Sequence, residues 1–336
     1  MDGKTAPQTG ARFQVLALDG GGVRGIYTAA LLAGLERDLG RPVTAVFDLV
    51  VGTSVGGIIA LGLGAGMAPE EILTTFLAER TRIFPNSLGW GRIRRPFVAK
   101  YRPQGLEAAL RGILGQRLLG ESQIPLVIPS YNLGENDVYL FKTPHHVRLR
   151  RDFRVPMWAV GMATTAAPTY FPAFPLPGDQ VRLIDGGIWA NNPAMVGVTE
   201  AVSMFGQELS AIRVLSLGTT STVQARRSRL DNAGLLRWAV NPSVIDICLH
   251  GQSVGAFAEV QHLLGKDHAH RLAPSVPDQL GSLDSCNPGE LVAKAAHFSR
   301  AFSPIFDEVF GSHTTHSYVP LHGPNTHRGD HVSVSN

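Results

Sequence analysis

The sequence predicts an α/β domain with a mainly parallel central sheet. Two segments typical of buried strands, 13–18 and 46–51, alternate with two helical segments, 27–39 and 57–64. Because neighbouring parallel strands need a crossover connection, this alternation predicts a parallel sheet with helices packed on it. The composition agrees, since 44% of the 336 residues are hydrophobic and can bury a large core. The 37 Gly and 22 Pro exclude a coiled coil.

Local patterns justify each element. The largely apolar run FQVLAL at 13–18 ends at an aspartate and a glycine cluster, as a buried strand before a tight turn does. Residues 27–39 place apolar side chains three or four positions apart, which predicts an amphipathic helix. The run VFDLVV at 46–51 predicts a second buried strand, and 57–64 an apolar helix covered on both sides. Further strands are expected at 126–128, 138–141, 181–184 and 214–217, and further helices at 106–114, 156–165, 193–205, 244–264 and 288–302.

These elements make one domain over residues 13–305, preceded by an N-terminal segment, 1–12, and followed by a polar tail, 306–336, that we expect to be mobile. Five of the twelve histidines lie in this tail. Their spacing gives no fixed ligand geometry, so a mobile tail is favoured over a metal site. The histidines concerned are His313, His316, His322, His327 and His331.

Several features predict a cytoplasmic globular protein. No apolar segment typical of a secretory signal follows the N-terminus, and the apolar and glycine run that contains 58–68 is shorter than the roughly 20 residues that span a bilayer. Cys248 and Cys286 are too few for a disulfide framework or a structural zinc site. Motifs of helix-turn-helix, zinc-finger or RNA-binding domains are lacking, so no nucleic acid polymer is expected as a partner.

The charge is unevenly distributed around the net value of +3. Between residues 80 and 102 there are seven basic side chains and no acidic one, interleaved with the aromatic residues Trp90, Phe97 and Tyr101. Such a stretch is either an ordinary solvated face or a surface for an anionic membrane or a phosphorylated ligand. The basic residues are Arg80, Arg82, Arg92, Arg94, Arg95, Lys100 and Arg102.

The pentapeptide Gly52-Thr-Ser54-Val-Gly56 follows a predicted strand and opens a predicted helix. In that context G-x-S-x-G predicts a nucleophile elbow, where flanking glycines permit a sharp turn and the serine projects from the sheet edge. The helix N-terminus can stabilise negative charge that develops there. A turn that merely packs a helix against a sheet is the alternative.

A second glycine motif, DGGGVRG at 19–25, also lies between a strand and a helix. Consecutive backbone N–H groups in such a loop can form an oxyanion hole. Gly20, Gly22 and Gly25 also satisfy the dinucleotide-binding pattern G-x-G-x-x-G. However, the acidic residue expected about 20 positions later is missing, and no Walker A motif is present. We therefore favour the oxyanion hole, which a crossover to the next strand would bring beside Ser54.

The motif Asp185-Gly186-Gly187 ends the strand expected at 181–184. An aspartate there can accept the serine proton directly, and the glycines permit close approach; an aspartate that only caps a turn is the alternative. A Ser-His-Asp triad would need a histidine in a glycine-marked turn after a strand. None of the available histidines meets this condition, which favours a Ser54–Asp185 dyad; they are His145, His146, His250 and His262.

The sequence resembles the patatin-like phospholipase family in the order of three motifs, DGGGVRG, GTSVGG and DGG. The segment ATTAAPTYFP at 163–172 is similar to the one between that family's nucleophile and aspartate. The resemblance spans about residues 13–300. It implies a three-layer α/β/α patatin-like fold and a lipid acyl hydrolase with Ser54 as nucleophile and Asp185 as base. It also implies an oxyanion loop at Gly20, Gly21 and Gly22, with Arg24 at the family's basic position, and no metal or other cofactor. We expect residues 163–167 and the aromatic residues Tyr170, Phe171 and Phe174 to line the acyl channel; ordinary core packing is the alternative.

The sequence is also similar to bacterial patatin-like effectors of cyclic-oligonucleotide anti-phage signalling, in the segments FDLVVGTSVGGIIALGLG, KYRP and IPSYN. This resemblance implies membrane phospholipids as substrate, reached from the inner face of the membrane, and a cyclic dinucleotide as activator. We also expect a homo-oligomer. Three alternatives stay open: a constitutive lipase or esterase, an acyltransferase on the same dyad, and a non-enzymatic nucleotide-binding module that uses the glycine loop.

Overall fold

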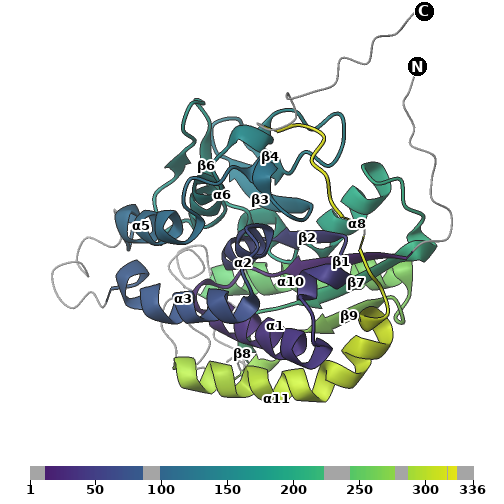
Figure 1. The fold of residues 1–336 in the computed structure, drawn as a ribbon. Helices are drawn as coiled ribbons and strands as arrows, with labels where there is room; N and C mark the ends of the chain where they lie inside the picture. Colours follow the sequence, from purple (N-terminus) through teal and green to yellow (C-terminus); the bar gives the residue numbers. More distant parts are fainter. Residues whose placement is uncertain (1–11, 86–98, 223–242, 277–286, 316, 324–336) are drawn as a thin grey trace, which may run out of the picture.

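The computed structural model describes residues 12–85, 99–222, 243–276, 287–315 and 317–323, which fold around a mixed sheet of eight strands (Figure 1). The path through the sheet is β5-β6-β3-β2-β1-β7-β9, and β4 pairs with β3. The strands β3, β2, β1, β7 and β9 pair in parallel. Strands β4 and β6 each pair antiparallel with β3, and β5 pairs antiparallel with β6. The predicted mainly parallel sheet is therefore confirmed. The bounds are β1 Phe13–Leu18, β2 Leu49–Gly52, β3 Leu126–Asn132, β4 Asp137–Lys142, β5 Phe174–Pro175, β6 Arg182–Asp185, β7 Ile212–Leu217 and β9 Ala269–Leu272. A separate parallel pair joins β8, Ser221–Thr222, to β10, Ser275–Val276.

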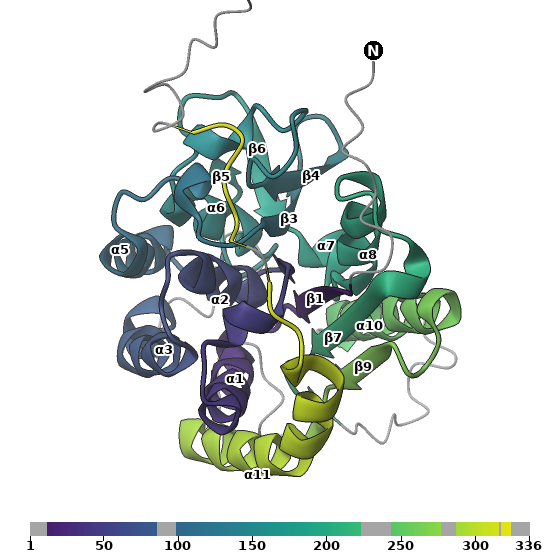
Figure 2. The ribbon, with the colours of Figure 1, turned by 45° about the vertical axis from the view of Figure 1, so that its right-hand side comes forward.

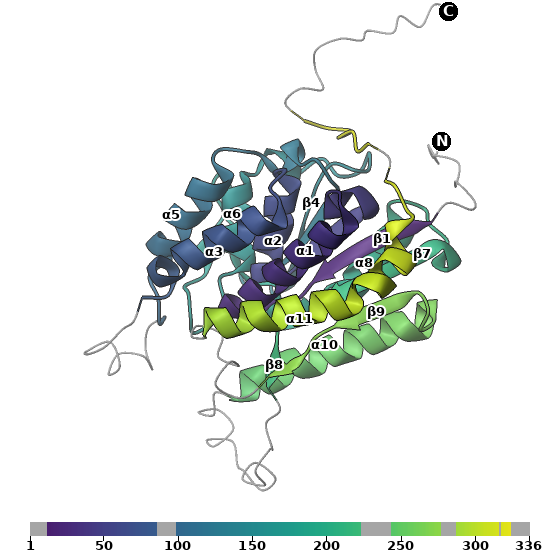
Figure 3. The same ribbon diagram turned by 60° about the horizontal axis from the view of Figure 1, so that its bottom comes forward.

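Helices cover both faces of the sheet, which confirms the three-layer fold (Figure 3). One face carries α1 Gly25–Leu39, α2 Val55–Gly64, α3 Pro69–Ile83, α5 Pro103–Leu114, α6 Met157–Thr164 and α11 Pro288–Phe306. Helix α1 packs against α11 (Figure 2). The other carries α8 Ala194–Ser203 and α10 Ser243–Leu264. Alternate residues of β1 serve the two layers: Leu16 and Leu18 pack in the core beneath α1, and Val15 and Ala17 in the core beneath α8.

Several elements differ from the sequence prediction. Helix α3 was not predicted, although Ile72 and Leu73 are buried in its first half. The strand expected to begin at 46 begins at Leu49, because 43–46 forms a 3₁₀ turn and the carboxylate of Asp48 accepts the N–H of Gln14 at 2.7 Å.

The packed chain continues past the boundary expected at residue 305. Helix α11 runs into a π-helical turn at Asp307–Gly311, in which Phe310 is fully buried. The Phe310 ring lies 5.7 Å from the ring of Phe47, so aromatic packing fixes the first part of the expected tail. Further along, His313 Nε2 lies 2.8 Å from Asp48 Oδ2, while His316, His327 and His331 lie outside the described residues. No group of metal-ligating side chains occurs among the residues that the structure describes.

The basic stretch is described only in part. Trp90, Phe97, Arg92, Arg94 and Arg95 lie outside the described residues. Tyr101 does not belong to a solvated face or an exposed binding surface, because it is buried and its ring packs on those of Phe84 and Phe171 at 5.4 and 5.8 Å. None of the helices in the described ranges is long and apolar enough to cross a membrane.

Candidate active site

Ser54 lies in a strained turn between β2 and α2. Its φ of 55° and ψ of −123° are values that side chains other than glycine rarely adopt, and such strain costs roughly 1–3 kcal/mol. The two flanking glycines make the turn possible. A Cβ at Gly52 would lie 2.3 Å from the carbonyl oxygen of Gly56, and a Cβ at Gly56 would lie 2.3 Å from that of Leu18. The turn therefore has the conformation of a nucleophile elbow.

Two threonines hold this elbow in place. Thr164 Oγ1, at the end of α6, accepts the N–H of Ser54 at 2.9 Å and donates to the carbonyl of Pro129 in β3 at 2.6 Å. Thr53 Oγ1 donates to the carbonyl of Ala190 at 2.6 Å. Because both threonines are buried, these bonds tie the strained residue to three neighbouring elements rather than to solvent.

Ser54 and Asp185 meet across β3. Asp185 is the last residue of β6, which pairs antiparallel with β3 so that Asp185 lies opposite Ser130. Ser54 Oγ donates to Asp185 Oδ2 at 2.7 Å, and the N–H of Gly187 donates to Asp185 Oδ1 at 2.7 Å. Gly186 packs so closely on β3 that a Cβ there would lie 2.3 Å from the carbonyl oxygen of Pro129. The structure thus joins two residues that are 131 positions apart in the chain.

The environment of Asp185 makes it a stronger base than an ordinary carboxylate. Burial raises its pKa from 3.8 to about 6, although the hydrogen bonds from Ser54 and Gly187 oppose this shift. At pH 7 the carboxylate is still ionised and can accept the Ser54 proton. A pKa close to the working pH is what a general base needs.

The glycine loop lies beside Ser54. A Cβ on Gly20 would lie 3.3 Å from the Cβ of Ser54, and Gly21 and Gly22 line the same cavity as Ser54. The N–H of Gly20 is already used, since it donates to the carbonyl of Asn191 at 3.0 Å. The N–H groups of Gly21 and Gly22 make no hydrogen bond to another described residue. They are therefore the donors that an oxyanion at Ser54 could use.

The carbonyl side of each peptide fixes the direction of these two N–H groups. Thr219 Oγ1 donates to the carbonyl of Gly20 at 3.2 Å, and Arg24 Nε donates to the carbonyl of Gly21 at 3.2 Å. In a trans peptide the C=O and the following N–H point in opposite directions, so holding the carbonyl aims the N–H of the next residue. Arg24 also donates to the carbonyl of Thr220 at 2.6 Å, which makes its role here the positioning of the loop.

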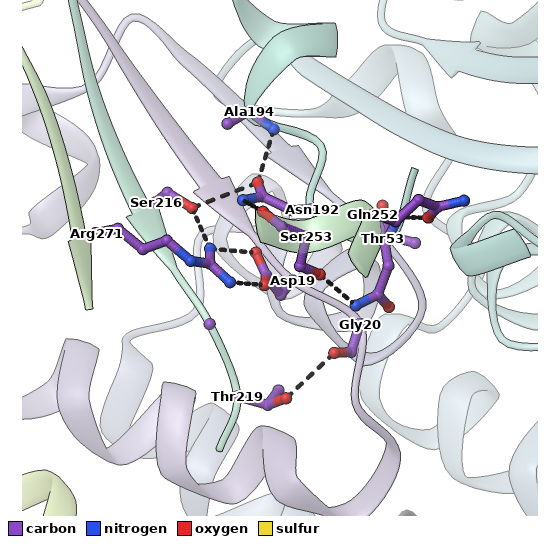
Figure 4. Close-up of polar contacts among 12 residues, drawn as sticks. Asp19, Gly20, Thr53, Asn192, Ala194, Ser216, Thr219, Gln252, Ser253 and Arg271 are labelled. Atoms are coloured by element: carbon purple, nitrogen blue, oxygen red, sulfur yellow. Dashed lines mark hydrogen bonds and ion pairs between the residues drawn. The ribbon is translucent and has the colours of Figure 1, made fainter. Parts of the chain in front are cut away.

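A largely buried ion pair anchors the start of the loop (Figure 4). Arg271 of β9 donates to both carboxylate oxygens of Asp19, at 3.1 and 2.6 Å, and to Ser216 Oγ at 2.6 Å. Such a planar, bidentate contact is geometrically specific. On the other side of the loop, Asn191 bonds to Ser253 of α10 through its amide at 2.8 Å. The glycine loop is thus held between β9 and α10.

An apolar cavity of about 320 Å³ opens at Ser54 and Asp185. Tyr170 and Phe171 line it as expected, whereas Phe174 does not and packs instead on Trp158, with ring centroids 6.2 Å apart. Most of the remaining lining is aliphatic or aromatic, from residues that include Ile26, Ile58, Phe76, Ile83, Phe84 and Leu106. The cavity can accept an extended apolar group with its polar end at Ser54.

Sequence reasoning missed three residues of this site. Thr164 lies inside the segment ATTAAPTYFP, which signalled its region but not its role. Thr219 and Arg271 follow no motif, because their function depends on where β7 and β9 end in space. No hydrogen bond joins a histidine to Ser54 or Asp185 among the described residues, and His145 is instead bonded to Glu200 at 2.9 Å.

The chain is similar in sequence to known proteins along most of its length. The family model of patatin-like phospholipases matches residues 16–198. A protein of Pseudomonas aeruginosa named cGAMP-activated phospholipase is 32% identical over 93% of this chain and 96% of its own length. Proteins of the same name from Vibrio cholerae and Escherichia coli are each 33% identical; they cover 61% and 62% of this chain, and 64% and 62% of their own lengths.

Proposed function

This chain belongs to the patatin-like phospholipase family of serine-dependent lipid acyl hydrolases, and we propose that it cleaves fatty-acyl esters of membrane phospholipids through Ser54 and Asp185. One observation carries the assignment of these residues. The Ser54 hydroxyl donates at 2.7 Å to a buried carboxylate at the end of an apolar cavity, beside two N–H groups of a glycine loop that bind no other described residue. Nucleophile, base and oxyanion donors therefore converge where the ester of a bound acyl chain would lie.

In the first step Asp185 accepts the Ser54 proton as Oγ attacks the ester carbonyl carbon. The N–H groups of Gly21 and Gly22 stabilise the oxyanion, and the positive end of α2 adds to this stabilisation. When the tetrahedral intermediate collapses, the bond to the glycerol oxygen breaks. That oxygen takes the proton from Asp185 and leaves as lysophospholipid, while the acyl group stays on Ser54.

In the second step water attacks the acyl-enzyme. Asp185 accepts a proton from this water, and the same two N–H groups stabilise the second oxyanion. Collapse then releases the fatty acid and returns the proton to Ser54 Oγ. Both steps use only protein groups and water, so the reaction needs no cofactor.

We further propose that a cyclic dinucleotide activates the enzyme and that it acts at the inner face of the membrane as an anti-phage effector. The support is the name shared by its relatives, cGAMP-activated phospholipase, one of which matches 93% of this chain. Regulation also has a physical rationale, because an unregulated phospholipase would degrade the bilayer of its own cell. The proposal places the enzyme in a latent state until the nucleotide is bound.

Lipid mass spectrometry on phospholipid vesicles, with and without cGAMP, tests both statements. We expect lysophospholipid and fatty acid in equal amounts, formed faster with cGAMP, and no product from Ser54→Ala or Asp185→Asn. A fluorophosphonate probe should label the wild type and not Ser54→Ala. Product formed at the wild-type rate by Ser54→Ala would overturn the assignment of the nucleophile. Full activity that no cyclic dinucleotide changes would overturn the proposed activation.

A further inference from the structure

The mouth of the Ser54 cavity carries an exposed apolar side chain. Ile188 lines the cavity and is also 49% exposed. It belongs to the short helix α7, Gly187–Ala190, which directly follows Asp185 and Gly186. Ile188 is therefore fixed close to the reacting groups, and its carbonyl accepts a hydrogen bond from Gln252 of α10 at 2.8 Å. One exposed apolar side chain is ordinary, but a contiguous apolar patch around the rim of a cavity indicates a surface that is covered when the site works.

The rest of this mouth has the same character. We define the mouth by six of the exposed and half-exposed lining residues: Arg80, Phe84, Pro168, Tyr170, Ile188 and Cys248. The amides of Asn191 and Gln252 also line the cavity, but they are bonded to Ser253 and to the carbonyl of Ile188. The mouth contains no acidic side chain. Its single charged residue, Arg80 near the end of α3, forms no ion pair with any residue that the structure describes; its guanidinium donates to the carbonyl of Leu77. A mouth of apolar side chains with one such cation matches the boundary between acyl chains and phosphate groups in a bilayer.

We propose that this mouth is the surface on which the enzyme docks on an anionic phospholipid bilayer, with Ile188 inserted among the acyl chains and Arg80 facing lipid phosphate. The inference rests on the proposed phospholipase function and adds to it the surface that meets the membrane. Docking through this mouth places the open end of the cavity against the lipid, so an acyl chain can enter the cavity without passing through water. The ester then reaches Ser54 from the side of the lipid.

The first experiment compares Ile188→Ser with Val147→Ser in the full chain, with cGAMP present. Val147 is 52% exposed and follows β4, which runs antiparallel to β3, so it lies at the sheet edge opposite the carboxyl ends of β1 and β2. Substrates are phosphatidylglycerol vesicles and the water-soluble ester p-nitrophenyl butyrate. We expect Ile188→Ser to lower the rate on vesicles roughly tenfold more than the rate on the soluble ester, because half of an isoleucine side chain is no longer buried in lipid. Val147→Ser should lower both rates equally or not at all.

The cation is tested on the same helix. Arg80→Gln should reduce the preference for phosphatidylglycerol over phosphatidylcholine vesicles about fivefold, since one basic side chain at an anionic surface contributes about that much. The matched control is Arg82→Gln, because Arg82 is paired with Glu79 at 3.5 Å and does not line the cavity. An equal loss of preference in both variants would show that only overall charge matters and would overturn the role of Arg80.

A third measurement detects docking without catalysis. Cys248 is exposed at the mouth, so a bimane label on it, in Ser54→Ala with Cys286→Ser, reports on the surroundings of the mouth. We expect a blue shift with phosphatidylglycerol vesicles and quenching by brominated lipid. The same label at Val147→Cys, with both native cysteines replaced by serine, should show neither.

The outcomes separate this inference from the proposed function. If the wild type hydrolyses neither substrate, the proposed function fails. If it hydrolyses vesicles but Ile188→Ser loses both rates equally, or the Cys248 label does not respond to vesicles that bind the protein, the docking surface is wrong. A change of oligomeric state in Ile188→Ser would identify a second copy of the chain as the occupant and would also overturn the proposal.

Discussion

Replacing Asp185 by asparagine should stabilise the protein while it abolishes activity. The carboxylate is buried, and this burial raises its pKa from 3.8 to about 6. A tenfold change in proton affinity corresponds to about 1.4 kcal/mol, so ionising Asp185 inside the fold costs at most ~3 kcal/mol at pH 7. Asparagine removes this cost and keeps the geometry, because its oxygen can accept the N–H of Gly187 and its amide can donate to Ser54.

The sign follows from proton linkage. Between pH 3.8 and about 6 the unfolded chain loses the Asp185 proton while the folded chain keeps it. The wild type therefore loses stability as the pH rises through this window, and Asp185→Asn does not. The advantage of the variant should be about 3 kcal/mol at pH 7 and about half of that at pH 5.

Thermal unfolding of wild type and variant at pH 5 and pH 7 measures this difference. For a chain of 336 residues, 3 kcal/mol corresponds to roughly 4 °C in the midpoint. Asp137→Asn is the control, since it removes one negative charge from an exposed position and should change the midpoint little at either pH. A variant that is less stable than the wild type at pH 7, or an advantage that is the same at both pH values, would refute the view that burial sets the pKa of Asp185.

Three further predictions concern other contacts. Because Asp185 must be ionised to accept a proton, kcat/KM on a soluble ester should rise about tenfold per pH unit up to about pH 6 and then level off. A kcat/KM that does not change from pH 5 to 8 would contradict the proposed role of Asp185 as base. Glu200→Gln should lower the free energy of unfolding by about 3 kcal/mol at pH 7, because Lys142 loses its buried partner. Since the pairing lowers the pKa of Glu200, this loss should shrink in acid; an unchanged free energy of unfolding at pH 7 would contradict the pairing. Thr219→Val should lower kcat about fivefold with KM unchanged, because the Gly20 carbonyl loses its hydrogen-bond donor. Thr219→Ser keeps the hydroxyl and should keep the wild-type kcat; an equal loss of kcat in both variants would show that only the packing of the side chain matters.

Local constraints explain what could be predicted from the sequence. An elbow needs glycine two positions before and after the serine, since a Cβ at Gly52 or Gly56 would meet backbone within 2.3 Å. The proposed oxyanion loop needs a residue without a side chain at Gly21, because a Cβ there would lie 2.2 Å from Thr219 Oγ1. Requirements of this kind leave a pattern of a few consecutive letters. The strands β1, β2 and β7 were predictable for a similar reason, because burial on both faces favours largely apolar runs.

Long-range polar contacts leave no such pattern. Arg271 bonds to Asp19 across 252 positions, and it lies in β9, a strand of four residues with the sequence AHRL. Nothing in those four letters distinguishes a strand from a loop, so neither β9 nor its ion pair was predicted. The antiparallel pairing of β6 with β3 depends likewise on the tertiary fold, and that pairing is what brings Asp185 opposite Ser130 and within reach of Ser54.

The two buried carboxylates Asp185 and Glu200 contribute differently to the stability of the fold. Glu200 is bonded to both Lys142 and His145, and these bonds lower its pKa. Asp185 forms no ion pair with any described residue, and it lies against a serine in a strained conformation. A cation beside Asp185 would stabilise the fold, but it would also lower the pKa of Asp185 and weaken the base. The proposed chemistry therefore requires that no cation lies beside Asp185, and the well-paired network around Glu200 is one of the places where the fold offsets the resulting loss of stability.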